Sequence, residues 1–309
     1  MKGLVIKSTG SWYRVKLEDD RIIPCRIRGK FRTSGMEITN PVAVGDHVEV
    51  VPVENEPSGL ITRIYERKNY IIRKSPNLSH KAQILAANID QAILIITLKQ
   101  PVTTTVFVDR FLASAEAYRI PVHLIFNKTD LYKKDEKKEL ENWLSLYRSL
   151  DYHCFTSSAP RKEGLDELEE LLQNRFTLIA GHSGVGKSTL LNIIDPDLKL
   201  KTGEISNYHQ SGKHTTTFPE MFAMKNGGYV IDTPGIKGFG MVDMDKEEIF
   251  HFFREIFRFS DRCRYHNCLH MDEPGCAVKE AVTKSKIAYS RYVSYINMME
   301  ENEGEKYRS

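Results

Sequence analysis

Hydrophobic and polar residues follow three patterns in turn along the 309 residues of the chain. Up to about residue 68, short runs alternate between apolar and polar positions and are broken by Gly and Asp, which is typical of a small antiparallel barrel. The runs that predict strands are 3–7, 12–16, 21–25 and 47–51. Residues 52–59 predict a loop and 63–76 a connection, so we expect a first domain, 1–68, with an OB-like barrel.

From about residue 80 to 240, apolar strand-length runs alternate with amphipathic helical patterns. The predicted strands are 92–97, 122–127, 152–155 and 176–180, and the predicted helices are 106–118, 134–150 and 165–172. This alternation is typical of an α/β doubly wound domain, here 69–240, whose ligand loops follow the carboxyl ends of the strands. We expect a third, mostly helical domain over 241–309, with helices over 246–259 and 277–299.

A glycine-rich loop joins the predicted strand 176–180 to a helical run that begins at Leu190. Its residues are Gly181, His182, Ser183, Gly184, Val185, Gly186, Lys187, Ser188 and Thr189. Glycines let successive backbone N–H groups surround an anion, and the positive end of the helix adds to the attraction. In this pattern Lys187 reaches the β- and γ-phosphates and Ser188 binds Mg²⁺. The loop therefore predicts a nucleoside triphosphate site, with a chance match in a glycine-rich turn as the alternative.

The sequence Asn127-Lys128-Thr129-Asp130 follows a predicted strand and indicates guanine recognition. Asp130 can accept hydrogen bonds from the ring N–H and the 2-amino group of guanine, whereas adenine lacks both donors and would leave a buried carboxylate unpaired. Asn127 is expected to join loops near the base, and the stem of Lys128 to cover its face. A further segment with Ser158 and Ala159 would place a backbone N–H near the guanine oxygen.

Two more segments are expected near the γ-phosphate. Asp232 and Gly235 belong to an Asp-Thr-Pro-Gly sequence after a predicted strand, where Asp232 would hold Mg²⁺ through water and the Gly235 N–H would sense the γ-phosphate. A polar loop before it carries three threonines that could order around Mg²⁺ and the γ-phosphate. Thr216 is the candidate Mg²⁺ ligand, with Thr215 and Thr217 as alternatives. Together these elements favour GTP over ATP.

The order of the motifs differs from that of ordinary small GTPases, in which the phosphate loop comes first. Here the guanine motifs precede it, so we expect a circularly permuted domain, which the closeness of domain termini allows. Many GTPases orient the attacking water with a glutamine, but position 236 holds Ile, so unassisted hydrolysis should be slow. His214 is the candidate catalytic residue that positions water, and an exposed loop histidine is the alternative.

Three of the five cysteines lie close together with a histidine, in the set Cys263, Cys268, His270 and Cys276. Three thiolates and one imidazole form a closed tetrahedral set, which predicts one structural Zn²⁺. Free cysteines in a loop are the alternative, and His266 is a competing ligand with less even spacing. The sequence shows no secretory signal, which would have favoured disulfides over metal binding. It also shows no apolar run long enough to cross a bilayer. We therefore expect a cytoplasmic monomer without membrane attachment.

The net charge of +3 is modest, so binding to nucleic acid would depend on local patches. Basic and aromatic residues are interleaved in the first domain, from Trp12 and Arg14 through Arg26 and Arg28 to Arg32. Such a face can follow a phosphate backbone while aromatic rings stack on bases. A solvated strand face with ordinary core aromatics explains the pattern equally well.

With these motifs placed, the chain resembles the ribosome small-subunit-dependent GTPase A family, also called RsgA or YjeQ, over nearly its whole length. The features that carry the resemblance are the permuted motif order, the loop 212–217 and the segment 263–276. The resemblance implies late maturation of the small ribosomal subunit, binding to its rRNA near the decoding region, and GTP hydrolysis that the subunit stimulates. It also favours RNA as the ligand of the barrel.

The resemblance further implies guanine contacts by Asn127 and Asp130, phosphate contacts by 181–189, and zinc ligation by the Cys₃His set. Two positions depart from the expected family pattern: His182 stands where a glutamine is expected and Lys213 where an arginine is usual. Two other functions remain open. One is a guanine-specific metabolic or RNA-modifying enzyme, and the other is a nucleotide-gated RNA-binding module whose hydrolysis is incidental.

Overall fold

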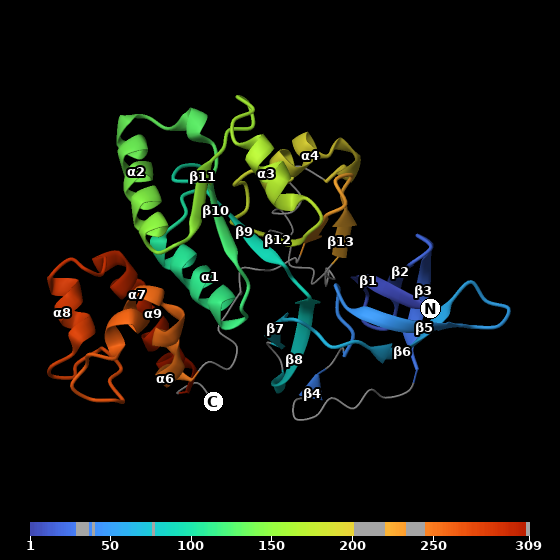
Figure 1. Cartoon of the computed structure of the whole chain (residues 1–309), viewed down its shortest axis with the longest axis horizontal. Helices are drawn as coiled ribbons and strands as arrows, with labels where there is room; N and C mark the ends of the chain where they lie inside the picture. The colour runs from blue at the N-terminus through green and yellow to red at the C-terminus, as the bar shows by residue number, and fades with distance from the viewer. Residues whose placement is uncertain (29–36, 39–40, 76–77, 201–219, 233–244, 307–309) are drawn as a thin grey trace.

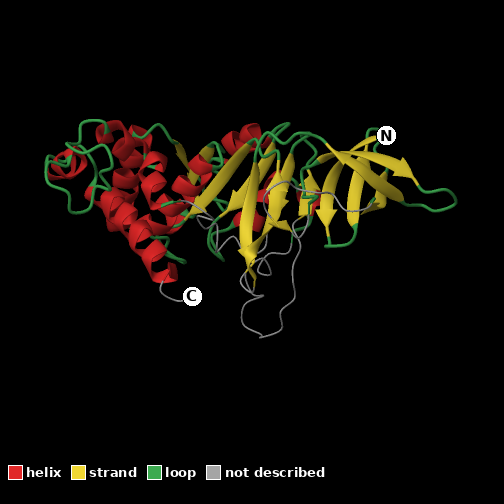
Figure 2. Ribbon diagram, turned by 90° about the horizontal axis from the view of Figure 1, so that it is seen from below, coloured by secondary structure: helices red, strands yellow, loops and turns green. Residues whose placement is uncertain are grey.

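The computed structural model describes the whole chain except residues 29–36, 39–40, 76–77, 201–219, 233–244 and 307–309. It gives no side-chain description for 37–38, 72–75, 78–83, 232 and 301–306. A β-barrel, an α/β unit and a helical region follow one another along an elongated molecule (Figures 1 and 2). The predicted multidomain fold class is confirmed, whereas the exact domain limits stay a prediction.

Among the described residues, five strands form the barrel: β1 (Lys2–Ser8), β2 (Tyr13–Leu17), β3 (Ile22–Ile27), β5 (His47–Pro52) and β6 (Gly59–Ile64). The order is β1-β2-β3-β6-β5, and pairing of β5 with β1 closes the barrel. Only β3 and β6 are parallel among these pairs. Alternation fixes the faces: Tyr13 and Val15 are buried and Arg14 is exposed. The OB-like barrel is confirmed, and β6 is a strand that the sequence pattern did not predict.

A small second sheet lies beside the barrel, in the order β4 (Glu37–Ile38), β8 (Leu78–Ala87) and β7 (Tyr70–Ser75). The expectation of a plain connection over 63–76 was therefore wrong. Asn69 fixes the start of this hairpin, because its side chain donates to the Ile89 carbonyl and accepts from the Ile89 N–H, both at 2.8 Å. Several charged residues in β7 and β8 interrupt the apolar pattern by which a strand is predicted from sequence.

In the described part of the α/β unit, five parallel strands follow the order β11 (His153–Thr156), β10 (Val122–Phe126), β9 (Gln91–Ile96), β12 (Phe176–Ala180) and β14 (Tyr229–Asp232). The antiparallel strand β13 (Glu220–Ala223) borders β14 and also pairs with β1 of the barrel at Lys7 and Glu220. Those two side chains form an ion pair at 2.7 Å. The sheet of the α/β unit thus continues into the barrel.

Helices cover both faces of this sheet (Figure 1). On one face lie α1 (Thr105–Ala117) and α2 (Lys134–Ser149), and on the other α3 (Leu165–Leu172) and α4 (Lys187–Ile194). Strand β9 is buried throughout because its alternate residues serve the two faces, Leu94 the first and Ile93 the second. Short 3₁₀ turns, η1 (Thr129–Leu131) and η2 (Pro196–Leu198), follow β10 and α4.

The described residues of the helical region form α6 (Lys246–Ile249), η4 (Phe250–Phe252), α7 (Arg254–Ser260), α8 (Ala277–Thr283) and α9 (Tyr289–Lys306). Both long helices expected here are interrupted, so those predictions were wrong. The first breaks at Phe253, which is extended (φ −109°, ψ 98°) and fully buried, so its ring enters the core. The second breaks at Ser285, whose φ of 54° is left-handed. Among the described residues, no helix is both long and apolar enough to span a membrane.

Candidate nucleotide site and metal centre

The phosphate loop connects β12 to α4, as the sequence predicts. Gly181 and Gly186 have φ of 137° and 101°, a backbone conformation that L side chains rarely adopt. A Cβ at Gly181 would stand 2.4 Å from the Ile95 carbonyl oxygen, and a Cβ at Gly186 would stand 2.4 Å from Nδ2 of Asn127. These two positions therefore require glycine both for conformation and for close approach.

Lys187 and Ser188 begin helix α4 directly behind the loop. The ammonium group of Lys187 donates to the carbonyls of Gly181 (2.7 Å) and His182 (2.8 Å), which holds it across the loop. Ser188 is buried in the first turn of the helix. The backbone N–H groups at the start of α4 and the Lys187 charge thus converge on one place, where an anion would be stabilised.

Asn127 joins the guanine motif to the phosphate loop. Its Nδ2 donates to the Val185 carbonyl at 2.7 Å, and its Oδ1 accepts from the Ser157 hydroxyl at 3.0 Å. The hydroxyl of Tyr132 donates to the Asn127 carbonyl at 2.8 Å and accepts from the Leu98 N–H at 2.9 Å. Burial raises the pKa of Tyr132 to about 12, which keeps this donor protonated. The sequence did not single out Ser157 for this role, nor Tyr132.

Asp130 and Lys128 stand at the open side of the site. The Ser158 hydroxyl donates to Oδ1 of Asp130 at 2.7 Å, which orients the carboxylate. Lys128 adopts a left-handed conformation, and its ammonium group donates to the Gln100 carbonyl at 2.7 Å. A pocket of about 500 Å³ opens here, lined by Asn127, Lys128, Asp130, Ala159, Gly186 and Thr189, among others. The structure therefore brings three predicted guanine residues, Asn127, Lys128 and Asp130, to one pocket with Gly186 and Thr189 of the phosphate loop.

The remaining predicted nucleotide residues divide into two groups. Asp232 ends strand β14, which runs beside β12 and so reaches the edge of the sheet that carries the phosphate loop. His214, Thr216 and Gly235 lie outside the described residues, as does Ile236. The proposed catalytic histidine and the threonine ligand of Mg²⁺ therefore stay predictions.

The four predicted zinc ligands converge between α7 and α8. The ligand atoms of Cys263, Cys268, His270 and Cys276 all lie within 4.8 Å of one another. Nδ1 of His270 is 3.5 Å from the sulfurs of Cys263 and Cys276, which are 4.0 Å apart. In tetrahedral Zn²⁺ sites with Zn–S near 2.3 Å and Zn–N near 2.1 Å, such pairs stand roughly 3.5–3.8 Å apart. The donor set fits a tetrahedral ion of this size.

Neighbouring groups hold this cluster in shape. The carboxylate of Glu273 accepts from the N–H groups of Leu269 (2.8 Å) and Met271 (2.9 Å), closing the turn around His270. Tyr292 of α9 donates to the His270 carbonyl at 2.7 Å. Burial raises the pKa of the Cys268 thiol to about 12. A bound cation would reverse that effect, because thiols coordinate metal as thiolates.

On the barrel, two of the interleaved basic and aromatic residues, Trp12 and Arg26, are in contact. The guanidinium of Arg26 lies over the ring of Trp12, 3.9 Å from its centroid, and Trp12 is 37% exposed. Tyr13 is instead a core residue, 1% exposed. Arg14 and Arg28 are exposed, whereas Arg32 lies outside the described residues. Part of the pattern is therefore ordinary core, and part is a basic, aromatic surface.

Two family models together cover most of the chain. One, described as RsgA GTPase, matches residues 64–242, and one described as RsgA N-terminal domain matches residues 2–61. The chain belongs to the RsgA GTPase family. The family predicted from the motif order and the cysteine cluster is thus confirmed.

Relatives in the RsgA family match over the full length. The small ribosomal subunit biogenesis GTPase RsgA of Phocaeicola vulgatus is 56% identical over 309 residues, covering 100% of this chain and 99% of the relative. The crystal structure of YjeQ from Thermotoga maritima is 37% identical, with a TM-score of 0.78 and 97% of both chains covered. The structure of YloQ, described as a circularly permuted GTPase, is 31% identical, with a TM-score of 0.75, covering 98% of this chain and 95% of that one.

Proposed function

We propose that this chain hydrolyses GTP as a late assembly factor of the small ribosomal subunit, that it binds rRNA of that subunit, and that hydrolysis releases it. The observation that carries the proposal is the pocket in which Asn127 and Asp130 lie together with Gly186 and Thr189 of the phosphate loop. Its relatives are named small ribosomal subunit biogenesis GTPases, which supports the choice of partner.

The residues proposed for the nucleotide site would have different roles in binding. Asp130, oriented by Ser158, would pair with the guanine edge, and Lys128 would cover its face. Lys187 and the loop N–H groups would hold the β- and γ-phosphates. Ser188, with Asp232 through water and Thr216, would hold Mg²⁺, which neutralises charge on the phosphates during transfer. His214 would position the attacking water.

The Cys₃His cluster would hold one structural Zn²⁺, because all four ligand positions are filled by protein and none remains for a substrate. The surface around Trp12 and Arg26 supports RNA as the ligand of the barrel, since a stacked guanidinium and an exposed ring can bind both phosphate and base. The proposed partner also places the protein in the cytoplasm, where we expect a monomer of three domains, 1–68, 69–240 and 241–309.

The test is GTP turnover by the purified protein alone, with small ribosomal subunits, and with large subunits as the control. We expect a rise of about two orders of magnitude or more with small subunits only, because a partner would complete the active site. Equal rates in all three conditions would contradict the proposed partner. They would favour the alternative, an RNA-binding module gated by nucleotide whose hydrolysis is incidental.

A further inference from the structure

Helix α1 has two buried faces that serve different parts of the molecule. Phe111 and Leu112 pack against the sheet of the α/β unit. Asp109, Ala113 and Glu116, which recur at helical spacing, face the helical region instead. In an α/β domain on its own, these three positions of the helix would face solvent. Here they contact the helical region, so the second face of α1 is an internal interface.

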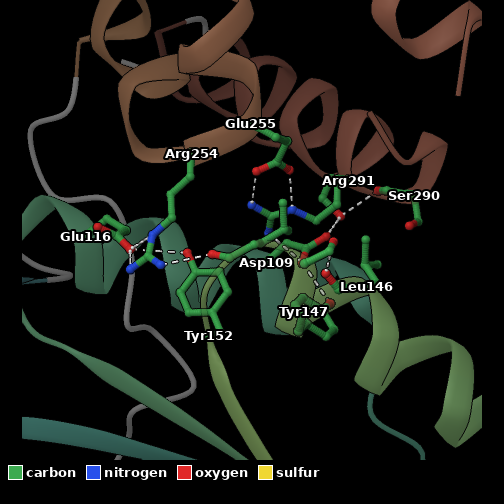
Figure 3. Close-up of polar contacts among 12 residues, drawn as sticks. Asp109, Glu116, Leu146, Tyr147, Tyr152, Arg254, Glu255, Ser290 and Arg291 are labelled. Carbon is green, nitrogen blue, oxygen red and sulfur yellow. Dashed lines mark hydrogen bonds and ion pairs between the residues drawn. The ribbon is translucent and has the colours of Figure 1, made fainter. Parts of the chain in front are cut away.

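A buried charge network fills the centre of that interface (Figure 3). Arg291 of α9 is 1% exposed and donates to Asp109 at 2.7 Å and to Glu255 of α7 at 2.6 Å. The Ser294 hydroxyl donates to the other oxygen of Asp109 at 2.6 Å, and Tyr147 of α2 donates to the first at 2.8 Å. Because buried ion pairs depend on exact geometry, α1, α7 and α9 must keep one arrangement to satisfy it.

The first turn of the same helix touches the phosphate loop. The ring of Phe107 stacks on the imidazole of His182, with ring centroids 4.0 Å apart and an angle of 30° between the planes. Thr104 caps the helix by accepting from the Phe107 N–H at 3.3 Å, which fixes the position of that residue. Phe107 lies only two residues before Asp109. The helix therefore carries a contact with the nucleotide site and the anchor of the helical region within its first two turns.

We propose that helix α1 couples the phosphate loop to the helical zinc region, with Phe107 as a positioning residue for the loop through His182. When nucleotide orders the phosphate loop, the contact with His182 fixes the position of Phe107 and of helix α1. The ion pair between Asp109 and Arg291 then fixes the position of α9 relative to α1. By thermodynamic linkage the effect is reciprocal, so the docked helical region strengthens nucleotide binding by the same factor. The proposal rests on the proposed nucleotide site.

The test is hydrogen exchange in the full-length protein, with and without GDP, read at the α9 amides of residues 292–299. GDP should slow their exchange in the wild type. Phe107→Leu, which removes the ring stack and keeps an apolar side chain, should reduce this effect and weaken GDP binding by about two- to tenfold. Phe107→Tyr keeps the ring and serves as the matched control, with the wild-type response expected.

A second variant tests the coupling from the other end. Ser294→Ala, a change in α9, removes one hydrogen bond to Asp109 of α1 and should speed GDP dissociation by about two- to tenfold. Unchanged α9 exchange on GDP binding, or a full GDP effect in Phe107→Leu, would overturn the coupling alone. Absence of GDP binding by the wild type would overturn the proposed nucleotide site and the coupling with it.

Discussion

The side-chain amide of Asn127 donates a hydrogen bond of 2.7 Å to the backbone carbonyl of Val185, across 58 residues of sequence. The guanine motif and the phosphate loop are therefore held together by the protein itself. The missing Cβ of Gly186 permits this contact, since a methyl group there would stand 2.4 Å from Asn127 Nδ2. Permutation reverses the order of the two motifs in the chain and leaves this contact possible, because the two loops follow β10 and β12, the parallel strands on either side of β9.

We expect Asn127→Ala to weaken GDP binding by about 1–3 kcal/mol, or roughly five- to 150-fold, because the Val185 carbonyl and the Ser157 hydroxyl lose a buried partner. Titration with a fluorescent GDP analogue measures the change. Asn69→Ala is the matched control, since Asn69 is also a buried asparagine that bonds to backbone groups, at Ile89 in the barrel-side hairpin. It should lower stability and leave nucleotide affinity unchanged; equal losses in both variants would refute the specific role of Asn127.

Asp130→Asn should change the preferred base from guanine to xanthine. A carboxylate accepts from both guanine donors, whereas an amide can accept from one N–H and donate to the carbonyl that xanthine carries instead of the 2-amino group. Competition binding with GDP and XDP gives the measurement, with GDP affinity falling by at least about a hundredfold. Ser158→Ala, which removes the hydroxyl that orients Asp130, should weaken both ligands modestly without exchanging them. Loss of all binding in Asp130→Asn with no gain for XDP would contradict the assignment.

Several elements could be predicted from local pattern because local physics decides them. The continuous apolar run of β9 indicates a strand buried on both faces, and the glycines of the phosphate loop occupy positions that only glycine satisfies. Phe253 shows the limit. Its position suits a continuous amphipathic helix, and the break follows from the need to bury that particular ring, which depends on residues elsewhere in the fold.

Long-range polar contacts could not be predicted from the sequence. Asp109 and Arg291 are 182 residues apart, and each reads as a solvent-facing residue of an amphipathic helix. Only the packing of α9 on α1 shows that both are buried. In the candidate site, Asn127 and Asp130 carry a known motif, whereas Ser157 and Tyr132 orient that motif without any sequence signal of their own.

Removal of a zinc ligand should loosen the helical region. Cys268→Ser should lower bound zinc from about one ion per chain to a small fraction, because the closed set loses one of four ligands. Elemental analysis of the purified protein and its thermal unfolding curve give the readouts. Cys154→Ser is the matched control, since Cys154 is a buried cysteine outside the cluster. Equal zinc content in wild type and Cys268→Ser would contradict the proposed centre.

The buried and the half-buried ion pairs of the helical interface should differ in strength. Asp109→Asn leaves Arg291 with one charged partner in a buried site, and we expect a loss of about 3–5 kcal/mol of stability. Glu116→Gln changes the Arg254 pair, whose side chains are 34% and 29% exposed, and should cost about 1 kcal/mol or less. Urea unfolding followed by circular dichroism compares them. Similar losses for the two variants would show that burial does not set the strength of this interface.

Acidification should destabilise the α/β unit through His123. Burial, followed by the charges of His153 and Arg175, lowers the pKa of His123 to about 4, and its Nδ1 lies 3.1 Å from Nδ1 of His153. An unfolded histidine has a pKa near 6.5, so the unfolded chain binds this proton first. The stability contributed by neutral His123 is complete above about pH 6.5 and is lost as the pH falls from there toward 4.

Between pH 7 and pH 5 this loss should amount to about 1 kcal/mol, after allowance for the partial exposure of the ring. His123→Gln should remove that part of the pH dependence, whereas His251→Gln, at an exposed position of the helical region, should retain it. The two tryptophans are Trp12 in the barrel and Trp143, whose ring lies 6.1 Å from that of Phe126. In a Trp12→Phe background, urea unfolding followed by Trp143 fluorescence therefore reports the α/β unit alone. If the free energy of unfolding changed with pH equally in the wild type and in His123→Gln, His123 would be excluded as the source of the pH dependence, because the variant lacks its titrating group.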